Sequence, residues 1–206
     1  MKKTLVFGGS FDPVHNGHLS LARAILRTGK VSCVLFVPAS VLPHTYKSGG
    51  NVTAFSHRFA MLERAIAGEE GFYLSDMEHR REGKSYTVDT LRILRSEGMW
   101  GELTLLMGAD SLAKLHTWKE AHALVEEFSL TVYPRKGVCV TREMLSPYWS
   151  GPEQDKLLAA RLKDVEEFDV SSTLVREICK KKAYSELSPF VKEGVLRYII
   201  QEQLYM

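Results

Sequence analysis

The amino-acid sequence predicts an α/β fold built on a doubly wound parallel sheet. Two observations support this prediction: short, continuously apolar runs recur along the chain, and segments with helical periodicity separate them. Continuous apolar runs are typical of strands that are buried on both faces of a parallel sheet. Their alternation with helices is typical of right-handed β-α-β crossovers. Ligands of such a sheet bind beyond the carboxyl ends of its strands, where the winding reverses.

The candidate strands are five short runs rich in aliphatic and aromatic residues, the second of which is β-branched and ends at Pro38. These runs are Leu5–Phe7, Val31–Val37, Phe72–Leu74, Leu103–Met107 and Leu130–Tyr133.

Helices are predicted from apolar stripes at helical spacing and from the glycines that end them. The first two stripes end at Gly29 and Gly68, and they comprise Leu21, Ala22, Ile25 and Leu26, then Phe55, Phe59, Leu62 and Ile66. Thr87 is a candidate N-cap for the next helix. Further helices are expected over residues 88–95, 119–128, 153–163, 173–182 and 189–203.

The chain of 206 residues is long enough for one substantial core, and it has neither internal repeats nor low-complexity tails. We therefore expect a single domain, 1–206. Residues 136–165 interrupt the β-α alternation with a mixed stretch that contains Pro147, Gly151 and Pro152. We interpret this stretch as an insertion within the domain.

The charges nearly balance, with 27 basic and 25 acidic residues and a net charge of +2. This balance argues against non-specific binding to nucleic acid, which needs a strong basic excess. No apolar stretch is long enough to span a membrane, and only four residues separate Met1-Lys2-Lys3 from Gly8, too few for the core of a signal peptide. The three cysteines, Cys33, Cys139 and Cys179, make no Cys-x-x-Cys pair. We expect buried free thiols in a cytoplasmic protein.

Residues 8–18, Gly-Gly-Ser-Phe-Asp-Pro-Val-His-Asn-Gly-His, follow the first strand and predict a binding site for a phosphate chain. Glycines let the backbone approach an anion closely, and the start of a helix supplies free N–H groups and a positive dipole end. His15 and His18 are spaced to face one ligand. The segment is neither a dinucleotide-binding glycine motif nor a P-loop. Two other interpretations are histidines that only cap the helix and a metal-binding pair, although further ligands are missing nearby.

This segment resembles the N-terminal motif of the nucleotidyltransferase superfamily related to class I aminoacyl-tRNA synthetases. The resemblance implies a Rossmann-like nucleotidyltransferase fold. It also implies that the His-x-Gly-His element, residues 15–18, clamps the phosphates of ATP, with Gly8, Gly9, Ser10 and Phe11 beside it.

Residues 170–176, Val-Ser-Ser-Thr-Leu-Val-Arg, place hydroxyl groups before a predicted helix and an arginine in its first turn. The hydroxyls are good N-caps, but together with the arginine they also make an anion site. The segment is similar to the superfamily's Ser-x-Thr-x-x-Arg motif, which faces the histidines across ATP. The resemblance implies that Ser171, Ser172, Thr173 and Arg176 bind ATP, with His15, His18 and Arg176 as the catalytic residues.

Other segments resemble bacterial nicotinate mononucleotide adenylyltransferases. They are Ser85–Leu91, Gly108–Leu112 with Trp118 after it, Pro43-His44, and the C-terminal residues Leu187–Pro189, Val195-Leu196, Tyr198-Ile199 and Leu204-Tyr205. The resemblance covers nearly the whole chain except about 136–165.

The resemblance gives several of these residues a function, and each also has a plain structural interpretation. Trp118 would stack on a pyridine ring, whereas a lone tryptophan is more often part of a core. Thr87 would bind the nicotinate carboxylate or only cap a helix. Asp110, after Gly108, would hold a ribose hydroxyl of ATP or the second substrate, cap a helix, or do both. Ser10 is assigned to both substrates.

Two departures from the family pattern affect the phosphate of the second substrate. The family's lysine directly after the histidine at position 44 is missing, so Lys47 either replaces its charge or is solvated surface. The family's Arg-Pro-Gly reads Arg135-Lys136-Gly137, and Arg135 is retained as a phosphate-binding candidate.

The predicted reaction is transfer of AMP from ATP to nicotinate mononucleotide, with Mg²⁺ carried on the phosphates and no protein metal ligand. The predicted partners are these small molecules, with no nucleic acid and no membrane. Alternatives are the same chemistry on nicotinamide mononucleotide or on another phosphorylated acceptor such as phosphopantetheine, and a nucleotide-sensing module without turnover. The sequence leaves the oligomeric state open.

Overall fold

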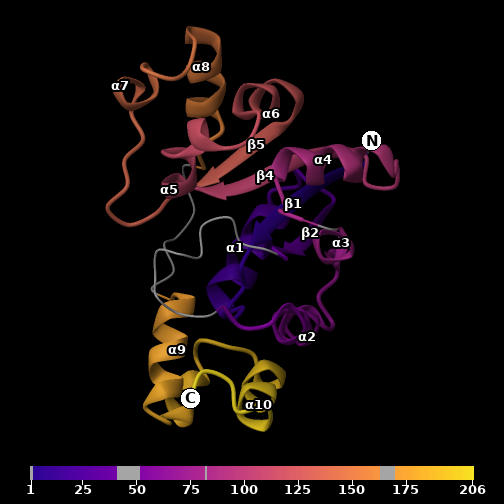
Figure 1. The fold of residues 1–206 in the computed structure, drawn as a ribbon, viewed down its shortest axis with the longest axis vertical. Helices are drawn as coiled ribbons and strands as arrows, with labels where there is room; N and C mark the ends of the chain where they lie inside the picture. The colour runs from indigo at the N-terminus through magenta and orange to yellow at the C-terminus, as the bar shows by residue number, and fades with distance from the viewer. Residues whose placement is uncertain (1, 41–51, 82, 163–169) are drawn as a thin grey trace.

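A computed structural model describes residues 2–40, 52–81, 83–162 and 170–206, and it confirms the predicted fold class. Five parallel strands form one sheet in the order β3-β2-β1-β4-β5, with helices on both faces (Figure 1). All five predicted strands are present, with ends shifted by one or two residues: β1 (Lys3–Gly9), β2 (Cys33–Pro38), β3 (Phe72–Leu74), β4 (Glu102–Gly108) and β5 (Ser129–Tyr133).

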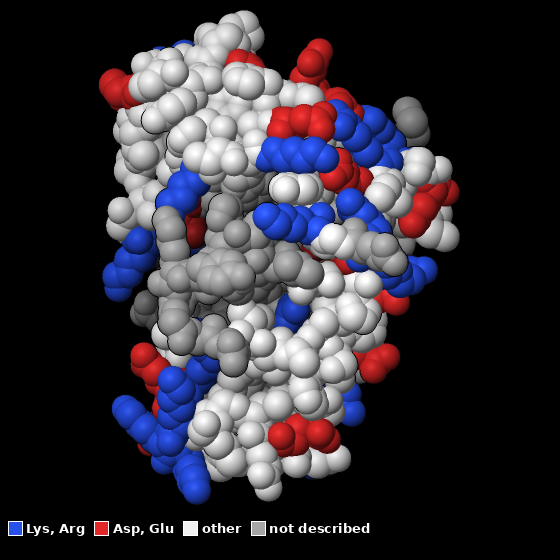
Figure 2. Space-filling model, viewed as in Figure 1, with Lys and Arg blue, Asp and Glu red and all other residues white. Residues whose placement is uncertain are grey.

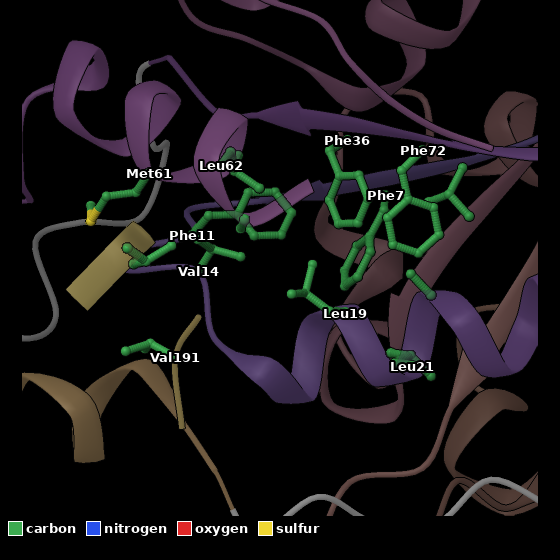
Figure 3. Close-up of a cluster of buried hydrophobic side chains, with 14 of the residues drawn as sticks. Phe7, Phe11, Val14, Leu19, Leu21, Phe36, Met61, Leu62, Phe72 and Val191 are labelled. Carbon is green, nitrogen blue, oxygen red and sulfur yellow. The ribbon is translucent and has the colours of Figure 1, made fainter. Parts of the chain in front are cut away.

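The sheet separates two hydrophobic clusters, because successive side chains of a strand point to opposite faces. Leu5 and Phe7 of β1 pack with α1 (Asn16–Arg27) and α2 (Phe55–Ile66) on one face. The aromatic part of this cluster, Phe7, Phe11, Phe36 and Phe72, is seen in Figure 3. Val6 points to the other face and packs with residues of α4 (Thr87–Ser96), α6 (Ala121–Glu127) and α8 (Gly151–Ala159).

The remaining helices are shorter or lie at the C-terminus. They are α3 (Met77–Arg80), α5 (Ala109–Leu112), α7 (Arg142–Leu145), α9 (Ser172–Lys180) and α10 (Glu193–Gln201), with 3₁₀ turns η2 (Leu115–Thr117) and η3 (Tyr184–Leu187). The sequence analysis missed α3, α5 and α7, since a four-residue helix is too short to show an apolar stripe. Helix α6 starts at Ala121 rather than 119 because Glu120 has a left-handed backbone (φ 49°). Helix α10 begins four residues later than predicted.

The buried face of α2 differs from the predicted stripe. Met61, Leu62 and Ala65 are buried, whereas Phe55, Phe59 and Ile66, at the predicted positions, are only partly buried or lie beside the core. The difference arises because Arg58, at 2% exposure, occupies the inward face of the helix. A charged residue in that place is invisible to an argument from apolar periodicity.

Residues 136–162 pack into the core on the face of the sheet that α4, α6 and α8 cover. Val140, Leu145, Trp149 and Leu157 join the cluster that contains Val6. Residues 160–162 run beside β5, where the N–H of Val132 donates to Ala160 and the N–H of Leu162 donates to Val132, both at 2.8 Å. The predicted helix over 153–163 is α8, which begins and ends earlier because Ser150 and Glu153 form a capping box.

The surface mixes both signs of charge, as the near balance of the sequence requires, and Figure 2 shows Lys and Arg interspersed with Asp and Glu on one face. Cys33 and Cys179 are buried free thiols as expected, but Cys139 is exposed, since it lies in the connection after β5. In the described ranges, no helix is both long and apolar enough to cross a membrane.

Candidate active site

The site lies where the winding of the sheet reverses, between β1 and β4. Both strands end in glycine at this edge, β1 at Gly9 and β4 at Gly108. A cavity of about 530 Å³ opens beside them. Its lining includes Gly8 and Gly9, Gly108, the start of α4 with Thr87, and Trp118. The structure therefore brings together segments that the sequence analysis assigned to two different substrates.

The loop of residues 10–15, between β1 and α1, is held through its carbonyl groups. Arg58 Nη1 donates to the carbonyl of Ser10 at 2.7 Å, and Arg176 Nη1 donates to that of Asp12 at 2.7 Å. Ser172 Oγ donates to the carbonyl of Pro13 at 2.8 Å. In a trans peptide the N–H points opposite to the C=O. The N–H of the residue after Ser10 and of the residue after Pro13 are thereby turned away from these anchors.

The side chain of Phe11 faces the core, so only its backbone is available to the site. Its ring is buried at 1% exposure among Phe7, Phe36 and His18, and its φ of 48° lies in the left-handed region. A non-glycine residue in that region is strained and persists where packing over-determines it. Gly9 is required beside it, because a Cβ there would lie 3.2 Å from the Phe11 ring.

His15 and His18 stack on one another, with ring centroids 3.7 Å apart and an interplanar angle of 30°. The backbone N–H of His15 donates to Nδ1 of His18 at 3.2 Å. In its neutral form, His18 therefore carries its proton on Nε2 and is a donor there. Nδ1 of His15 is buried and has no partner among the described residues. The stacked pair thus contains one buried polar atom, Nδ1 of His15, that still lacks a hydrogen-bond partner.

Both imidazoles are neutral near pH 7 without a ligand. Burial, followed by the charge of Arg135, lowers the pKa of His15 to about 4. Burial, then the neighbouring His15 and Arg135, lowers the pKa of His18 well below its usual value. A neighbouring phosphate favours the protonated form of an imidazole. Folding alone opposes that form, because it removes water from the rings.

The α9 segment faces the same loop, as predicted, but its groups are partly engaged. Ser171 caps α9 by accepting from the N–H of Leu174 at 3.1 Å, and Thr173 Oγ1 accepts from Arg176 at 3.3 Å. Ser172 donates its only hydroxyl hydrogen to the carbonyl of Pro13. A phosphate can therefore use the remaining N–H groups of Arg176 and the hydroxyl hydrogens of Ser171 and Thr173.

Asp110 and Arg135 meet over Gly108. The carboxylate Oδ1 lies 3.6 Å from Arg135 Nε, both side chains are exposed, and the guanidinium also donates to the hydroxyl of Tyr133 at 2.8 Å. A Cβ at position 108 would lie 2.3 Å from Asp110 Oδ1, so a larger residue there would displace this carboxylate. Arg135 thus lies close enough to His15 and His18 to affect their pKa values.

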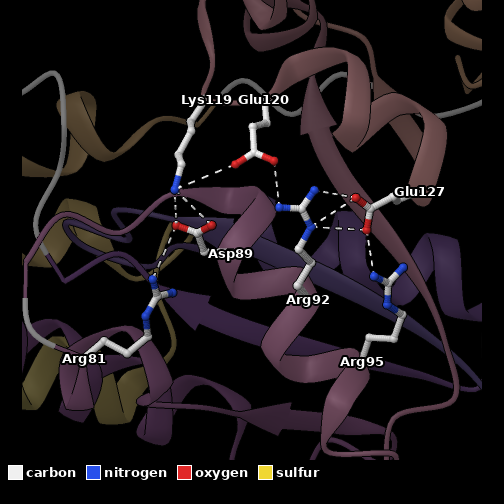
Figure 4. A network of polar contacts seen from close by, with 7 residues as sticks. All are labelled: Arg81, Asp89, Arg92, Arg95, Lys119, Glu120 and Glu127. Atoms are coloured by element: carbon white, nitrogen blue, oxygen red, sulfur yellow. Dashed lines mark hydrogen bonds and ion pairs between the residues drawn. The ribbon is translucent and has the colours of Figure 1, made fainter.

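Thr87 and Trp118 both line the cavity. Thr87 is the first residue of α4 and not its N-cap as predicted, since Tyr86 occupies the cap position. Trp118 follows η2 and is half-buried, with one side against the core and the other in the cavity lining. A charge network joins the segments that contain them (Figure 4). Asp89 of α4 binds Lys119 at 2.9 Å and Arg81 at 3.7 Å.

The network continues along α4 to α6, where Arg92 contacts Glu120 and Glu127, and Arg95 contacts Glu127. Exposed ion pairs of this kind contribute little stability individually. Together they connect α4 with the segment that contains Lys119 and Glu120 and with α6.

The cavity contains an acid that the sequence analysis missed. Glu78 of α3 is 9% exposed, accepts from Thr90 Oγ1 at 2.9 Å, and lines the cavity with Lys84 and Lys119. Burial raises its pKa, and its hydrogen bonds partly oppose this. Arg58, Asp12 and Tyr205 were also missed as site residues. Asp12 and Tyr205 lie in segments that the sequence singles out, but no role was assigned to them there. Lys47 and the Pro43-His44 pair lie outside the described residues.

Comparisons with known proteins agree with this geometry. Residues 6–178 match the cytidylyltransferase-like family. A protein of Neisseria meningitidis named "probable nicotinate-nucleotide adenylyltransferase" is 39% identical, over all of this chain and 99% of its own. A protein of that name from Clostridium tetani is 35% identical over the full length of both chains.

Solved structures share the fold. Plasmodium falciparum nicotinic acid mononucleotide adenylyltransferase complexed with NaAD superposes with a TM-score of 0.78 at 18% identity, covering 100% of this chain and 98% of the other. The same protein complexed with APC gives a TM-score of 0.77, with the same identity and coverage.

The chain belongs to the cytidylyltransferase-like family of nucleotidyltransferases. Within it, the chain belongs with the nicotinate-nucleotide adenylyltransferases, whose members match it from end to end.

Gly17→Ala is expected to destabilise the protein by about 1–3 kcal/mol through overpacking. A Cβ at position 17 would lie 2.7 Å from Val170 Cγ1 and 3.1 Å from the His15 ring. Gly194→Ala is the matched control, because Gly194 also occupies the second position of a helix but its nearest neighbour would be 3.6 Å away. The control is expected to gain about 0.5–1 kcal/mol. Denaturant unfolding measures both, and equal changes would contradict the packing described.

The imidazole of His15 is expected to stay neutral down to about pH 4 in the ligand-free protein. Because the pKa is lower in the folded than in the unfolded state, its contribution to stability is complete above pH 6.5. That contribution falls by about 1.4 kcal/mol per pH unit as the pH drops toward 4. NMR titration of the ring carbons measures the pKa directly. A midpoint near 6.5 without ligand would contradict the burial that we describe.

Proposed function

We propose that this protein transfers AMP from ATP to nicotinate mononucleotide, giving nicotinate adenine dinucleotide and pyrophosphate, as a step in NAD synthesis. One observation carries the proposal: the histidine pair and its loop adjoin, at a single sheet edge, a cavity walled by Trp118 and the start of α4. A triphosphate site and an aromatic-ring site that share an edge suit the joining of two nucleotides. The full-length relatives and the NaAD and APC complexes of the Plasmodium enzyme support the same substrates, APC being an ATP analogue.

On the ATP side, His18 Nε2–H and the His15 ring donate to oxygens of the α- and β-phosphates. Gly8, Gly9, Ser10 and Phe11 contribute backbone close to the anion, and Arg176 with Ser171 and Thr173 binds the distal phosphates. Ser172 acts mainly by holding Pro13. A phosphate oxygen between the rings favours their protonation, opposing the effect of burial. Charge that develops on the phosphates is then met by donors already oriented.

On the acceptor side, Trp118 stacks on the pyridine ring. The free N–H groups at the start of α4, with Thr87, meet the nicotinate carboxylate, which a helix N-terminus favours over a neutral amide. Lys84 and Lys119 in the same lining add positive charge. Asp110 would bind a ribose hydroxyl, and Arg135 the mononucleotide phosphate; both are exposed at this edge. Lys47 stays a candidate for the same phosphate.

The reaction needs positioning more than acid-base chemistry. An oxygen of the mononucleotide phosphate forms a bond to the α-phosphorus, while the bond from that phosphorus to the bridging oxygen breaks. The electron pair leaves with pyrophosphate. Because the attacking oxygen is already anionic near pH 7, no general base is required, and alignment with electrostatic stabilisation supplies the rate.

We also propose that Mg²⁺ is bound with ATP. The described residues contain no group of three or more metal-ligating side chains. This fits an ion held chiefly by phosphate oxygens and water, which is how Mg²⁺ usually enters nucleotide sites. When bound, the ion would neutralise phosphate charge, and no protein ligand is assigned to it.

We further propose that the chain acts as one domain in the cytoplasm. The family match spans residues 6–178, and residues 138–157 contribute to the same core as the strands. The buried thiols Cys33 and Cys179 are unpaired, as is usual in a reducing compartment.

Pyrophosphate release from ATP is expected with nicotinate mononucleotide, and at a rate about 10-fold or more lower with nicotinamide mononucleotide, since the amide lacks the charge that α4 meets. The assay compares both mononucleotides and phosphopantetheine under the same conditions. Lys30→Ala, on the exposed turn after α1, is the control. Release with neither mononucleotide would disprove the proposed function.

His18→Ala is expected to lower kcat by about 10²–10³, the effect of removing one oriented donor from a developing anion. His122→Ala is the matched control, since His122 is exposed and paired with Glu153 on α8. Steady-state kinetics with circular dichroism separates loss of chemistry from loss of fold. Turnover near that of the control would remove His18 from the mechanism.

A further inference from the structure

Asp12 connects the phosphate-binding loop to the last residues of the chain. The side chain is 6% exposed, and both of its oxygens have partners. Tyr205 donates its hydroxyl hydrogen to Oδ1 at 2.7 Å, across 193 residues of sequence, and the N–H of Thr53 donates to Oδ2 at 3.4 Å. The backbone carbonyl of the same aspartate accepts from Arg176. Asp12 is therefore constrained from the C-terminal segment twice.

The buried charge of Asp12 is balanced by Arg58, which is 2% exposed. Each of the three guanidinium nitrogens of Arg58 donates a hydrogen bond to a backbone carbonyl. Besides the carbonyl of Ser10, Arg58 binds those of Thr53 and Ala39, each at 2.8 Å. The attraction between the two charges opposes the lowering of the Arg58 pKa by burial. Helix α2, which carries Arg58, packs on α10, which leads to Tyr205.

Tyr205 lies in a turn whose backbone angles are unusual for residues that carry a Cβ. Gln203 and Tyr205 both have left-handed φ angles, 52° and 64°, after the end of α10. The N–H of Leu204 donates to Ile199 at 3.0 Å and closes the turn. Such angles cost about 1–2 kcal/mol each for residues with a Cβ, so the contacts of the side chain have to maintain them. Burial also raises the pKa of Tyr205, and its hydroxyl stays a donor throughout the physiological range.

We propose that Tyr205 is a positioning residue for ATP: through Asp12 it maintains the loop conformation in which the Phe11 N–H and His15 face the triphosphate. The C-terminal turn is then part of the machinery that binds ATP, although it touches no substrate. This inference rests on the proposed function, because it takes the loop to bind ATP. The acceptor cavity is lined by Gly8 and Gly9, while Tyr205 and Asp12 are absent from its lining.

The experiment removes one hydroxyl group and compares the two substrates. Tyr205→Phe is expected to weaken binding of α,β-methylene ATP about tenfold, as expected for one lost hydrogen bond to a charged group. The KM for ATP is expected to rise by a similar factor. The KM for nicotinate mononucleotide is expected to stay within about twofold, because the substitution affects only the loop proposed to bind ATP. Titration calorimetry without acceptor measures the analogue, so this result does not depend on turnover.

Tyr198→Phe is the matched control. It also removes a tyrosine hydroxyl near the C-terminus, one that bonds His57 Nδ1 at 3.0 Å and does not reach the loop. Thermal unfolding of both variants corrects for a general loss of stability. Asp12→Asn, which keeps the shape but removes the charge, is expected to weaken the analogue at least as much as Tyr205→Phe.

Three results would overturn the proposal. They are unchanged analogue binding in Tyr205→Phe, an equal loss in Tyr198→Phe, or a parallel rise in KM for both substrates. If the protein bound the analogue as expected but formed no dinucleotide with either mononucleotide, the proposed function would fail while the positioning role of Tyr205 stood.

Discussion

The site depends on how the peptide groups of residues 10–13 are oriented, and that orientation is set from outside the loop. Arg58 of α2 binds the carbonyl of Ser10, while Arg176 and Ser172 of α9 bind those of Asp12 and Pro13. A short loop after a strand does not fix the orientation of its own peptide groups. The φ and ψ angles of each residue can rotate, and no neighbouring strand binds the backbone. At Ser10 and Pro13, a cation or a hydroxyl on the carbonyl side leaves the N–H of the next residue for an anion. Arg58 and Ser172 therefore shape the loop without a direct role at the substrate in the proposed function.

This arrangement places buried charge beneath a site for a highly charged ligand. Arg58 and Asp12 are nearly inaccessible to water, and each is surrounded by hydrogen-bonding partners, which is what makes burial of a charge tolerable. Burial has the opposite consequence for the histidines, because it favours their neutral form. Burial keeps them neutral near pH 7, and in the proposed function a bound phosphate would favour their protonation. One loop thus joins a permanently charged support to a pair whose charge depends on the ligand.

The acceptor side uses a different principle, because its walls are separate elements. Thr87 begins α4, while Trp118 follows η2, and neither contacts the other through backbone hydrogen bonds. Side-chain charges on Asp89, Arg81 and Lys119 connect them instead. Such exposed pairs are weak individually and adjustable together. The spacing of the aromatic wall from the helix N-terminus is therefore less rigid than the phosphate loop.

The sequence by itself determined the class of fold and the five strands, and it indicated the two segments proposed to bind phosphate, because apolar periodicity, glycine positions and polar motifs are local properties. It also indicated Thr87, Asp110 and Trp118. Only the tertiary structure decided which partners these residues have. Arg58 interrupts an apolar stripe, Ser172 bonds Pro13 rather than capping its helix, and Tyr205 reaches Asp12 across the chain. Such contacts join distant segments, and the histidine pKa values are lowered by burial together with the charge of Arg135, so neither can be predicted from the order of residues.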